Sequence, residues 1–241
     1  MATRIEKALA RERLILDRAW QLVASEGFLA LKVSELAKLA EVSIGTLYVH
    51  FASKEDLIVA MAMDAWKGME QVLVRALEYE ETPIRCLLAF SIMAHRYNID
   101  NPIRFEASQL AAVPSIWQRA SAARQQQVPE SCDAFEKRLT PEITAAIDNG
   151  DLRADGELQR QIDAIGHGLW AVSIGNAYIN YVITPESMRE EHAFRLERDV
   201  RRHIIALFKG YGWSEPNPGK VYDEVAENCM RLVTEELDMN N

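Results

Sequence analysis

Apolar residues recur at helical spacing along nearly the whole chain, and no stretch alternates apolar and polar residues as a β-strand would. The longer predicted helices cover residues 5–26, 53–79, 83–99, 115–149, 157–183, 185–211 and 221–237. Within 115–149 the pattern contains Pro129 and Pro141, which predict a break or kink there. The chain is therefore predicted to be all-α.

Two short helices are predicted after the first long one, over residues 35–40 and 44–51, with residues 41–43 between them. Gly27 ends the first long helix, and a serine is placed to cap each following one. These capping serines are Ser34, Ser43 and Ser53. Glu41 occupies the turn position where glycine adopts a positive φ most easily, at a cost of about 1 kcal/mol. Two short helices joined by a tight turn and supported by a longer one make a helix-turn-helix.

The second short helix has a narrow apolar side. Leu47 and Phe51 are four residues apart, so both can face a core. The residues that this arrangement turns outward are Gly45, Thr46, Tyr48 and Val49. A short, capped, exposed helix with small polar residues and a tyrosine suits insertion into a DNA groove.

Charge divides the chain into two parts. The net charge is −9 over 241 residues, yet residues 1–54 carry eight Lys or Arg and six Asp or Glu, a net charge of +2. The remainder carries 19 basic and 30 acidic residues, a net charge of −11. Opposite signs suggest an N-terminal part that meets a polyanion and a body that does not. We therefore predict a DNA-binding domain over 1–54 and a larger helical domain over 55–241.

Several protein classes are disfavoured by composition. The longest apolar run, 168–183, is 16 residues long and contains a serine and two asparagines, so it predicts a buried helix and not a membrane span. The N-terminus lacks the apolar core of a signal peptide. The three cysteines are far apart and odd in number, which suggests neither a disulfide framework nor a metal cluster. We expect a cytoplasmic protein without metal or cofactor.

Residues 33–57 resemble the TetR family of one-component bacterial regulators. The resemblance lies in an L-A-x-x-A helix, then V-S-x-G-T-L-Y-x-H-F, then S-K-E-D-L, and it covers about the first 60 residues. Two positions depart from the pattern: Glu41 replaces the turn glycine, and Ile44 stands where a polar or basic residue is more usual. The first departure leaves the fold unthreatened, and the second makes the operator sequence harder to deduce.

The resemblance implies a homodimer that places one short helix per subunit in successive major grooves of a palindromic operator, roughly 34 Å apart. Thr46 and Tyr48 are then candidates for base-edge or sugar contacts, Gly45 for close backbone approach and Ile44 for a thymine methyl. The candidates for phosphate contacts are Ser34, Ser43, His50 and Lys54. The candidates for a mobile basic arm are Arg4, Lys7 and Arg11. Tyr48 has an alternative interpretation as a partly buried supporting residue.

The resemblance also implies a small-molecule effector bound in the body, whose binding releases a repressor from DNA. Candidate pocket residues are Trp66, Met69, Met93, Tyr97, Phe105, Trp117, Trp170 and Asn176. Residues of these types are more often plain core, which is the alternative for each of them. The acidic body favours a neutral or cationic effector over an anion.

The same resemblance implies that two long helices pair with their symmetry mates. Gly168 and Gly175, seven residues apart on one face, hint at close backbone approach. Apolar candidates for this dimer seam are Ile174, Tyr178, Tyr181, Val200, Ile204, Leu207 and Phe208. Intrachain core is the alternative for each of them.

Two other functions compete with a regulator. The segment 166–171 fits the G-x-G-x-x-A dinucleotide pattern, but it lies inside a predicted helix with no preceding strand, and the five histidines lack metal-ligand spacing. We therefore predict that the protein is not an enzyme. A helical protein whose helix-turn-helix binds another protein remains the second alternative. Salt dependence discriminates it, because phosphate contacts release counterions.

Overall fold

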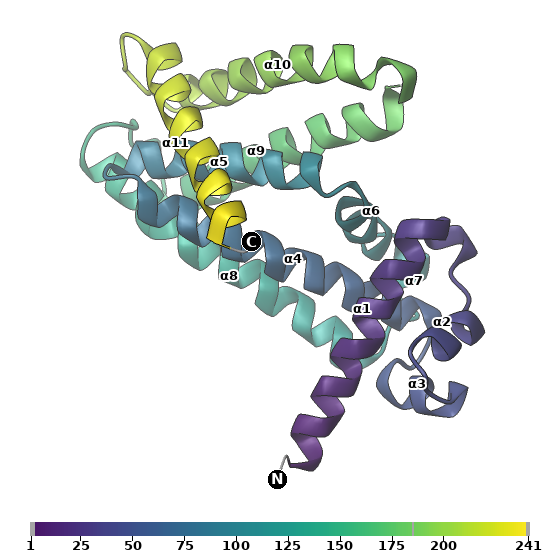
Figure 1. Ribbon diagram of the computed structural model, residues 1–241. Helices are drawn as coiled ribbons and strands as arrows, with labels where there is room; N and C mark the ends of the chain where they lie inside the picture. The colour runs from purple at the N-terminus through teal and green to yellow at the C-terminus, as the bar shows by residue number, and fades with distance from the viewer. Residues whose placement is uncertain (1–2, 185, 240–241) are drawn as a thin grey trace. The chain divides into compact units, whose positions relative to one another are not determined.

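The structure, a computed structural model, describes the backbone of residues 3–184 and 186–239 (Figure 1). Side chains are described except for residues 79, 128–134, 182, 183, 186, 189–196 and 232–239. Over these ranges the chain is helical and contains no strand, so the predicted all-α fold is confirmed. The helices are α1 (Arg4–Ala30), α2 (Val33–Leu39), α3 (Ile44–His50), α4 (Lys54–Tyr79), α5 (Pro83–Asp100), α6 (Pro102–Ala111), α7 (Pro114–Trp117), α8 (Ala122–Asp148), α9 (Leu158–Tyr178), α10 (Arg189–Gly210) and α11 (Pro218–Met239). A π-helical turn, Ile179–Ile183, follows α9, and a 3-10 turn, Glu186–Met188, precedes α10.

The chain forms two compact units. The first comprises Met1–Lys67 and Ile103–Ser131, and the second comprises Gly68–Pro102 and Cys132–Asn241. These units do not follow the predicted boundary at 54/55. The physical reason is burial, because the first half of α4 and residues of α6 belong to the same apolar core as α1–α3. The members of that core from α4 and α6 are Leu57, Ile58, Ala60, Met61 and Ala107.

Two expectations about the N-terminal helices are wrong, and both concern helix starts. Thr3 and Glu6 form a reciprocal capping box, so α1 begins at Arg4 and the basic residues predicted as a mobile arm lie in its first turns. Lys32, and not Ser34, is the N-cap of α2, because the Lys32 carbonyl already accepts the N–H groups of Glu35 and Leu36. Ser34 is left as an exposed residue in the first turn of α2.

The predicted turn and caps around α3 are confirmed. Glu41 has a φ of 54°, and among the described residues no other non-glycine residue has a positive φ. The Ser43 hydroxyl accepts the Thr46 N–H at 2.9 Å. The Ser53 hydroxyl accepts the Asp56 N–H at 2.9 Å, while the Asp56 carboxylate reaches back to the Ala52 N–H at 3.0 Å. Local hydrogen bonds thus fix the start of α3 and the start of α4.

The second unit is built around α5. Eleven of its eighteen residues are buried, and α5 contacts both α9 and α11. The helices α9 and α10 lie side by side in this unit (Figure 1). The break predicted within α8 is absent, since the backbone is helical through Pro129 and Pro141. Pro141 cannot donate to the Lys137 carbonyl, but Lys137 is exposed and water can satisfy that oxygen.

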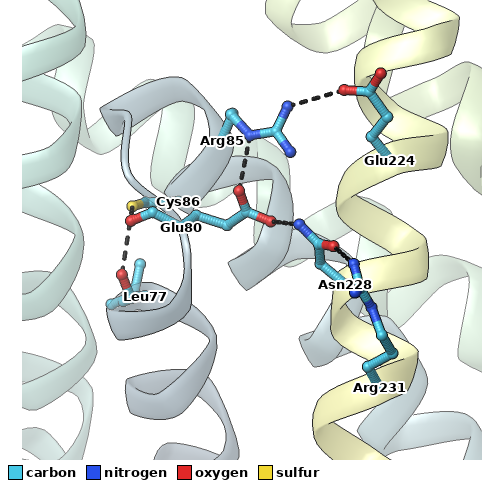
Figure 2. Close-up of polar contacts among 7 residues, drawn as sticks. All are labelled: Leu77, Glu80, Arg85, Cys86, Glu224, Asn228 and Arg231. Atoms are coloured by element: carbon cyan, nitrogen blue, oxygen red, sulfur yellow. Dashed lines mark hydrogen bonds and ion pairs between the residues drawn. The ribbon is translucent and has the colours of Figure 1, made fainter.

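A polar network joins α11 to the turn between α4 and α5 (Figure 2). The Glu80 carboxylate, whose side chain is only 4% exposed, accepts Arg85 Nε at 2.7 Å and Asn228 Nδ2 at 2.9 Å. Arg85 also contacts Glu224 at 3.2 Å. The buried charge therefore has a cation and a neutral donor, which is the pairing that a buried carboxylate requires.

Candidate nucleic-acid interface and effector region

The surface of α3 is divided as its sequence predicts. Leu47 and Phe51 are 1% and 0% exposed and belong to the core of the first unit, which confirms their assignment to the core. Ile44 and Tyr48 are each 48% exposed and Val49 is 83% exposed. Large apolar side chains on a seven-residue helix gain nothing from such exposure unless a partner covers them. One side of α3 is therefore buried in the core, and the opposite side is exposed and available for a partner.

The N-terminal end of α3 presents hydroxyl and amide groups. The Ser43 and Thr46 hydroxyl oxygens are 2.8 Å apart, Ser43 is exposed and Thr46 is half-buried. Gly45 is exposed, and a Cβ there would meet only the Ser43 hydroxyl, at 3.7 Å. Short polar side chains beside a helix N-terminus can donate to an anion, and they leave room for a backbone to approach.

Two predicted phosphate ligands have protein partners instead. The His50 side chain is only 11% exposed, and its Nδ1 lies 3.9 Å from a Glu12 carboxylate oxygen. Lys54 Nζ donates to the Phe28 carbonyl at 3.4 Å. Both residues lie at the C-terminal end of α3 or just beyond it. Their roles on DNA stay predictions, as do those of the other named residues of α3 and of Ser34.

Asp64 of α4 is an anchor of the first unit that sequence reasoning missed. Its carboxylate accepts Arg13 at 2.5 Å, the Trp20 indole N–H at 2.9 Å and Arg104 at 3.0 Å. Burial by itself would raise the pKa of Asp64, but the bonds from Trp20 and Arg104 and the charge of Arg13 lower it below its ordinary value. The only sequence signal was an acid within the otherwise apolar run 57–66.

The predicted pocket residues fall into both units. In the first unit, Trp66 and Trp117 are half-buried against a small cluster of alanines and Val59, and Phe105 is buried. In the second unit, Met93 is buried in the core and Met69 packs against it. The Tyr97 hydroxyl lies against Gly68, because a Cβ added at Gly68 would be 2.6 Å from the hydroxyl oxygen. Asn176 is buried and donates to the Val172 carbonyl at 2.6 Å. Trp170 is 66% exposed and faces outward from α9.

Buried polar side chains gather on the facing sides of α5 and α9. Their positions are i, i+4, i+7 on α5 and i, i+3, i+7 from α9 into the π-helical turn, so each set forms a stripe. They are Ser91, His95, Asn98, Ser173, Asn176 and Asn180. Asn98 donates to the Ser173 hydroxyl at 3.1 Å, which places the stripes in contact. This spacing was visible in the sequence, but polar residues at helical spacing are ordinarily assigned to the solvent face of a helix, so the pattern did not indicate that both stripes are buried.

Two atoms near these stripes have no partner among the described residues, His95 Nδ1 and Asn180 Oδ1. Unpaired polar atoms at buried positions are rare in folded proteins and are usually satisfied by water or a ligand. Burial, with a smaller contribution from the charge of Arg96, lowers the pKa of His95 from 6.5 to about 4. The ring is therefore neutral at pH 7, and the stripes carry no formal charge.

The predicted dimer seam is only partly at the surface. Val200, Ile204 and Phe208 are at most 1% exposed and form intrachain core, so for these three residues the core alternative holds and the seam does not. On the same helix, Leu207 packs closely against α9, because a Cβ on Gly168 would lie 2.8 Å from it. The Tyr181 hydroxyl donates to the Ile99 carbonyl. Gly168 thus serves packing within the chain.

The outer face of α9 and the following turn is apolar and exposed. Trp170 is 66%, Tyr178 45% and Ile179 39% exposed, while Ile174 is half-buried. A Cβ on Gly175 would meet no described atom within 4 Å. Single exposed apolar residues are ordinary, but a stripe of them on one helix marks a binding face.

No group of His, Cys, Asp and Glu among the described residues could hold a metal ion. Over the same part of the chain, no helix has the length and hydropathy needed to span a membrane.

Two short helices with a capped turn, one of them exposing a tyrosine and hydroxyl groups, define the class of helix-turn-helix transcriptional regulators. The model of the bacterial regulatory proteins of the TetR family matches residues 15–61, which contain this motif. Over these residues the chain is similar to the regulators of the TetR family.

Other regulators are similar over longer stretches. The fatty acid metabolism regulator protein of Bacillus subtilis is 24% identical over 155 residues, which is 61% of this chain and 75% of the relative. The structure of RolR with resorcinol matches at a TM-score of 0.61 and 15% identity, covering 91% of this chain and 96% of RolR. The structure of FadR from Bacillus subtilis in complex with stearoyl-CoA matches at a TM-score of 0.58 and 16% identity, covering 82% of this chain and 98% of FadR. At these identities the two structures show that the fold is shared.

Proposed function

We propose that this transcriptional regulator is a homodimeric repressor that binds a palindromic operator through α3 and leaves it when a small molecule binds in the body. The observation that carries the proposal is the exposed face of α3, where Tyr48 and Ile44 stand unburied beside the hydroxyl groups of Ser43 and Thr46. A dimer across two major grooves blocks polymerase without further machinery, which favours repression over activation.

On DNA, Thr46 and Tyr48 contact base edges or sugars, and Ile44 contacts a thymine methyl. Gly45 lets the backbone approach. Ser34 and Ser43 are exposed and bind phosphates from the helix starts. Lys54 and His50 act from the C-terminal end of α3 once they exchange their protein partners for phosphate.

The exposed face of α9 supports the homodimer. Trp170, Tyr178 and Ile179 form an apolar stripe beside the open surface at Gly175, and a second copy would cover it. A two-fold interface of this kind matches a palindromic operator, because protein symmetry and half-site symmetry correspond.

The effector follows from the chemistry of the second unit. The buried stripes of α5 and α9 are neutral and contain unpaired polar atoms, while their surroundings are apolar. They favour an apolar compound with an uncharged hydrogen-bonding group, such as a thioester carbonyl or a phenol hydroxyl. Stearoyl-CoA and resorcinol, bound in the two similar structures, each carry such a group.

The first experiment selects bound fragments from sheared source DNA and then titrates salt on the enriched fragment. We expect an enriched palindrome, and affinity that falls steeply between low and moderate salt because phosphate contacts release counterions. No enrichment, or binding indifferent to salt, would contradict the operator and favour a protein partner. Repeating the selection after unfolding and refolding removes a co-purified ligand as a cause of failure.

The effector is tested with stearoyl-CoA and resorcinol as probes. A ligand that binds the folded protein raises its melting temperature, and an effector also lowers the affinity for the selected fragment. His95→Leu is the informative variant, because it removes an unpaired buried atom and fills a similar space. A melting shift that His95→Leu leaves unchanged would contradict the assigned site.

A further inference from the structure

The end of α3 is contacted from a distant part of the sequence. Residues 119–124, which connect α7 to the first turn of α8, belong to the same compact unit as α1–α3. We call them the 119–124 segment. Its contacts fall on Phe51, which is the C-cap of α3, on Ser53 in the link between α3 and α4, and on the first turn of α4.

Backbone groups of the 119–124 segment hold the link between α3 and α4. The Ser121 N–H donates to Asp56 at 2.8 Å, and the other oxygen of that carboxylate accepts the Ala52 N–H at 3.0 Å. The Ser53 hydroxyl donates to the Arg119 carbonyl at 3.0 Å. Asp56 is only 2% exposed, so these bonds are shielded from water.

Arg124 contacts the C-cap of α3 and a residue of α1. Its Nη2 lies 2.5 Å from a Glu12 carboxylate oxygen, and the second oxygen of Glu12 lies 3.9 Å from His50 Nδ1. The guanidinium carbon stands 5.5 Å from the centroid of the Phe51 ring. The Arg124 side chain is 15% exposed, so both contacts are largely desolvated and specify one arrangement.

We propose that Arg124 is a positioning residue for the recognition helix, fixing the C-terminal end of α3 through Glu12 and the Phe51 ring. As a consequence, α8 controls the placement of α3 in addition to the direct covalent link through α4. Because α8 continues along the chain from the first unit into the second, a ligand that displaces α8 there alters α3 through this segment. This consequence for DNA rests on the function proposed above, whereas the positioning of α3 does not.

The first unit contains a matched control. Arg104 pairs with Asp64 at 3.0 Å and stands 4.7 Å from the Trp20 ring, so it combines an ion pair with an aromatic ring as Arg124 does. Its partners lie on α4 and α1, and neither of them is the C-cap of α3 or contacts His50. Loss of Arg104 therefore costs stability by the same kind of mechanism without touching the recognition helix.

The test compares Arg124→Gln with Arg104→Gln by hydrogen exchange without DNA. Arg124→Gln should speed amide exchange over residues 44–52 by about tenfold, because local opening becomes easier. Arg104→Gln should leave exchange over 44–52 unchanged while lowering the unfolding midpoint. Equal effects of both variants on α3, or no effect of either, would overturn the positioning role.

Two further variants guard against misfolding and test the consequence. Glu12→Gln keeps the Arg124–Phe51 contact and should produce a smaller increase in exchange, and Arg124→Lys should restore part of the protection. On the selected DNA fragment, Arg124→Gln should lower affinity about tenfold more than Arg104→Gln. Faster exchange of α3 with unchanged DNA affinity would overturn control by α8, and failure of the unchanged protein to bind any fragment would instead overturn the proposed function.

Discussion

The helices α3 and α5 are held in place by different means. Of the seven residues of α3 only Leu47 is buried, whereas eleven of the eighteen residues of α5 are buried. Burial of apolar surface stabilises α5 directly. The position of α3 depends on its caps, on Phe51 and on polar contacts from α1 and the 119–124 segment. Substitutions in α5 should therefore change stability, and substitutions on the outer face of α3 should change binding.

The largest stability effect is expected from Leu88→Ala. Leu88 is 0% exposed in α5, so truncation loses transfer free energy and leaves a cavity, at about 2–5 kcal/mol. Denaturant unfolding measures the difference. Val49→Ala is the matched control on α3, and with an 83% exposed side chain it should cost less than about 0.5 kcal/mol. Similar costs for the two would contradict the contrast between the helices.

The pH dependence of the unfolding free energy tests the burial of α5 at His95. Its folded pKa of about 4 lies below the ordinary 6.5, so the unfolded chain takes up the proton first. Its contribution to stability is fully present above pH 6.5 and decreases by about 3 kcal/mol as pH falls to 4. His95→Gln should remove that part of the pH dependence of the unfolding free energy. An identical pH profile for the variant would show that His95 is not the responsible group.

A smaller loss is expected from Asp64→Asn, which weakens the anchor between α1, α4 and α6. The substitution replaces the Asp64 carboxylate, which accepts from three donors, by a neutral amide, and this should lower the unfolding free energy by about 1–3 kcal/mol at pH 7. The folded pKa of Asp64 is lowered, so its stabilisation is present above the ordinary value of 3.8 and is lost as pH falls below it. Unfolding measured at pH 7 and at pH 3 should therefore show the difference between the two proteins shrinking at the lower pH.

The smallest stability effect is expected from Tyr48→Ala, together with a large effect on DNA. Tyr48 is 48% exposed, so the unfolding free energy should change by less than about 0.5 kcal/mol. Affinity for the selected fragment should fall by roughly tenfold to a hundredfold if the ring and hydroxyl contact base edges or sugar. Tyr48→Phe separates the hydroxyl from the ring. Unfolding of the first unit by Tyr48→Ala would show that Tyr48 supports the core.

Sequence reasoning was most accurate where local hydrogen bonds decide the backbone. The caps at Ser43 and Ser53 and the positive φ of Glu41 were predicted, because each depends on residues within four positions. It was wrong at Ser34, because the first N–H groups of α2 donate to the Lys32 carbonyl and not to a serine side chain. It could not decide between a seam and intrachain core at Val200, Ile204 and Phe208, because an apolar stripe does not say which helix covers it.

The sequence by itself therefore determined the helices, the helix-turn-helix and the outward face of α3, since 3.6-residue periodicity and capping act over short distances. Only the tertiary structure decided that residues 103–131 belong with the N-terminal helices, and that Asp64 gathers three donors. Arg124 meets Glu12 across 112 residues of sequence. No local rule selects such a partner, because the two charges meet only when α1 and the first turns of α8 fold into one compact unit.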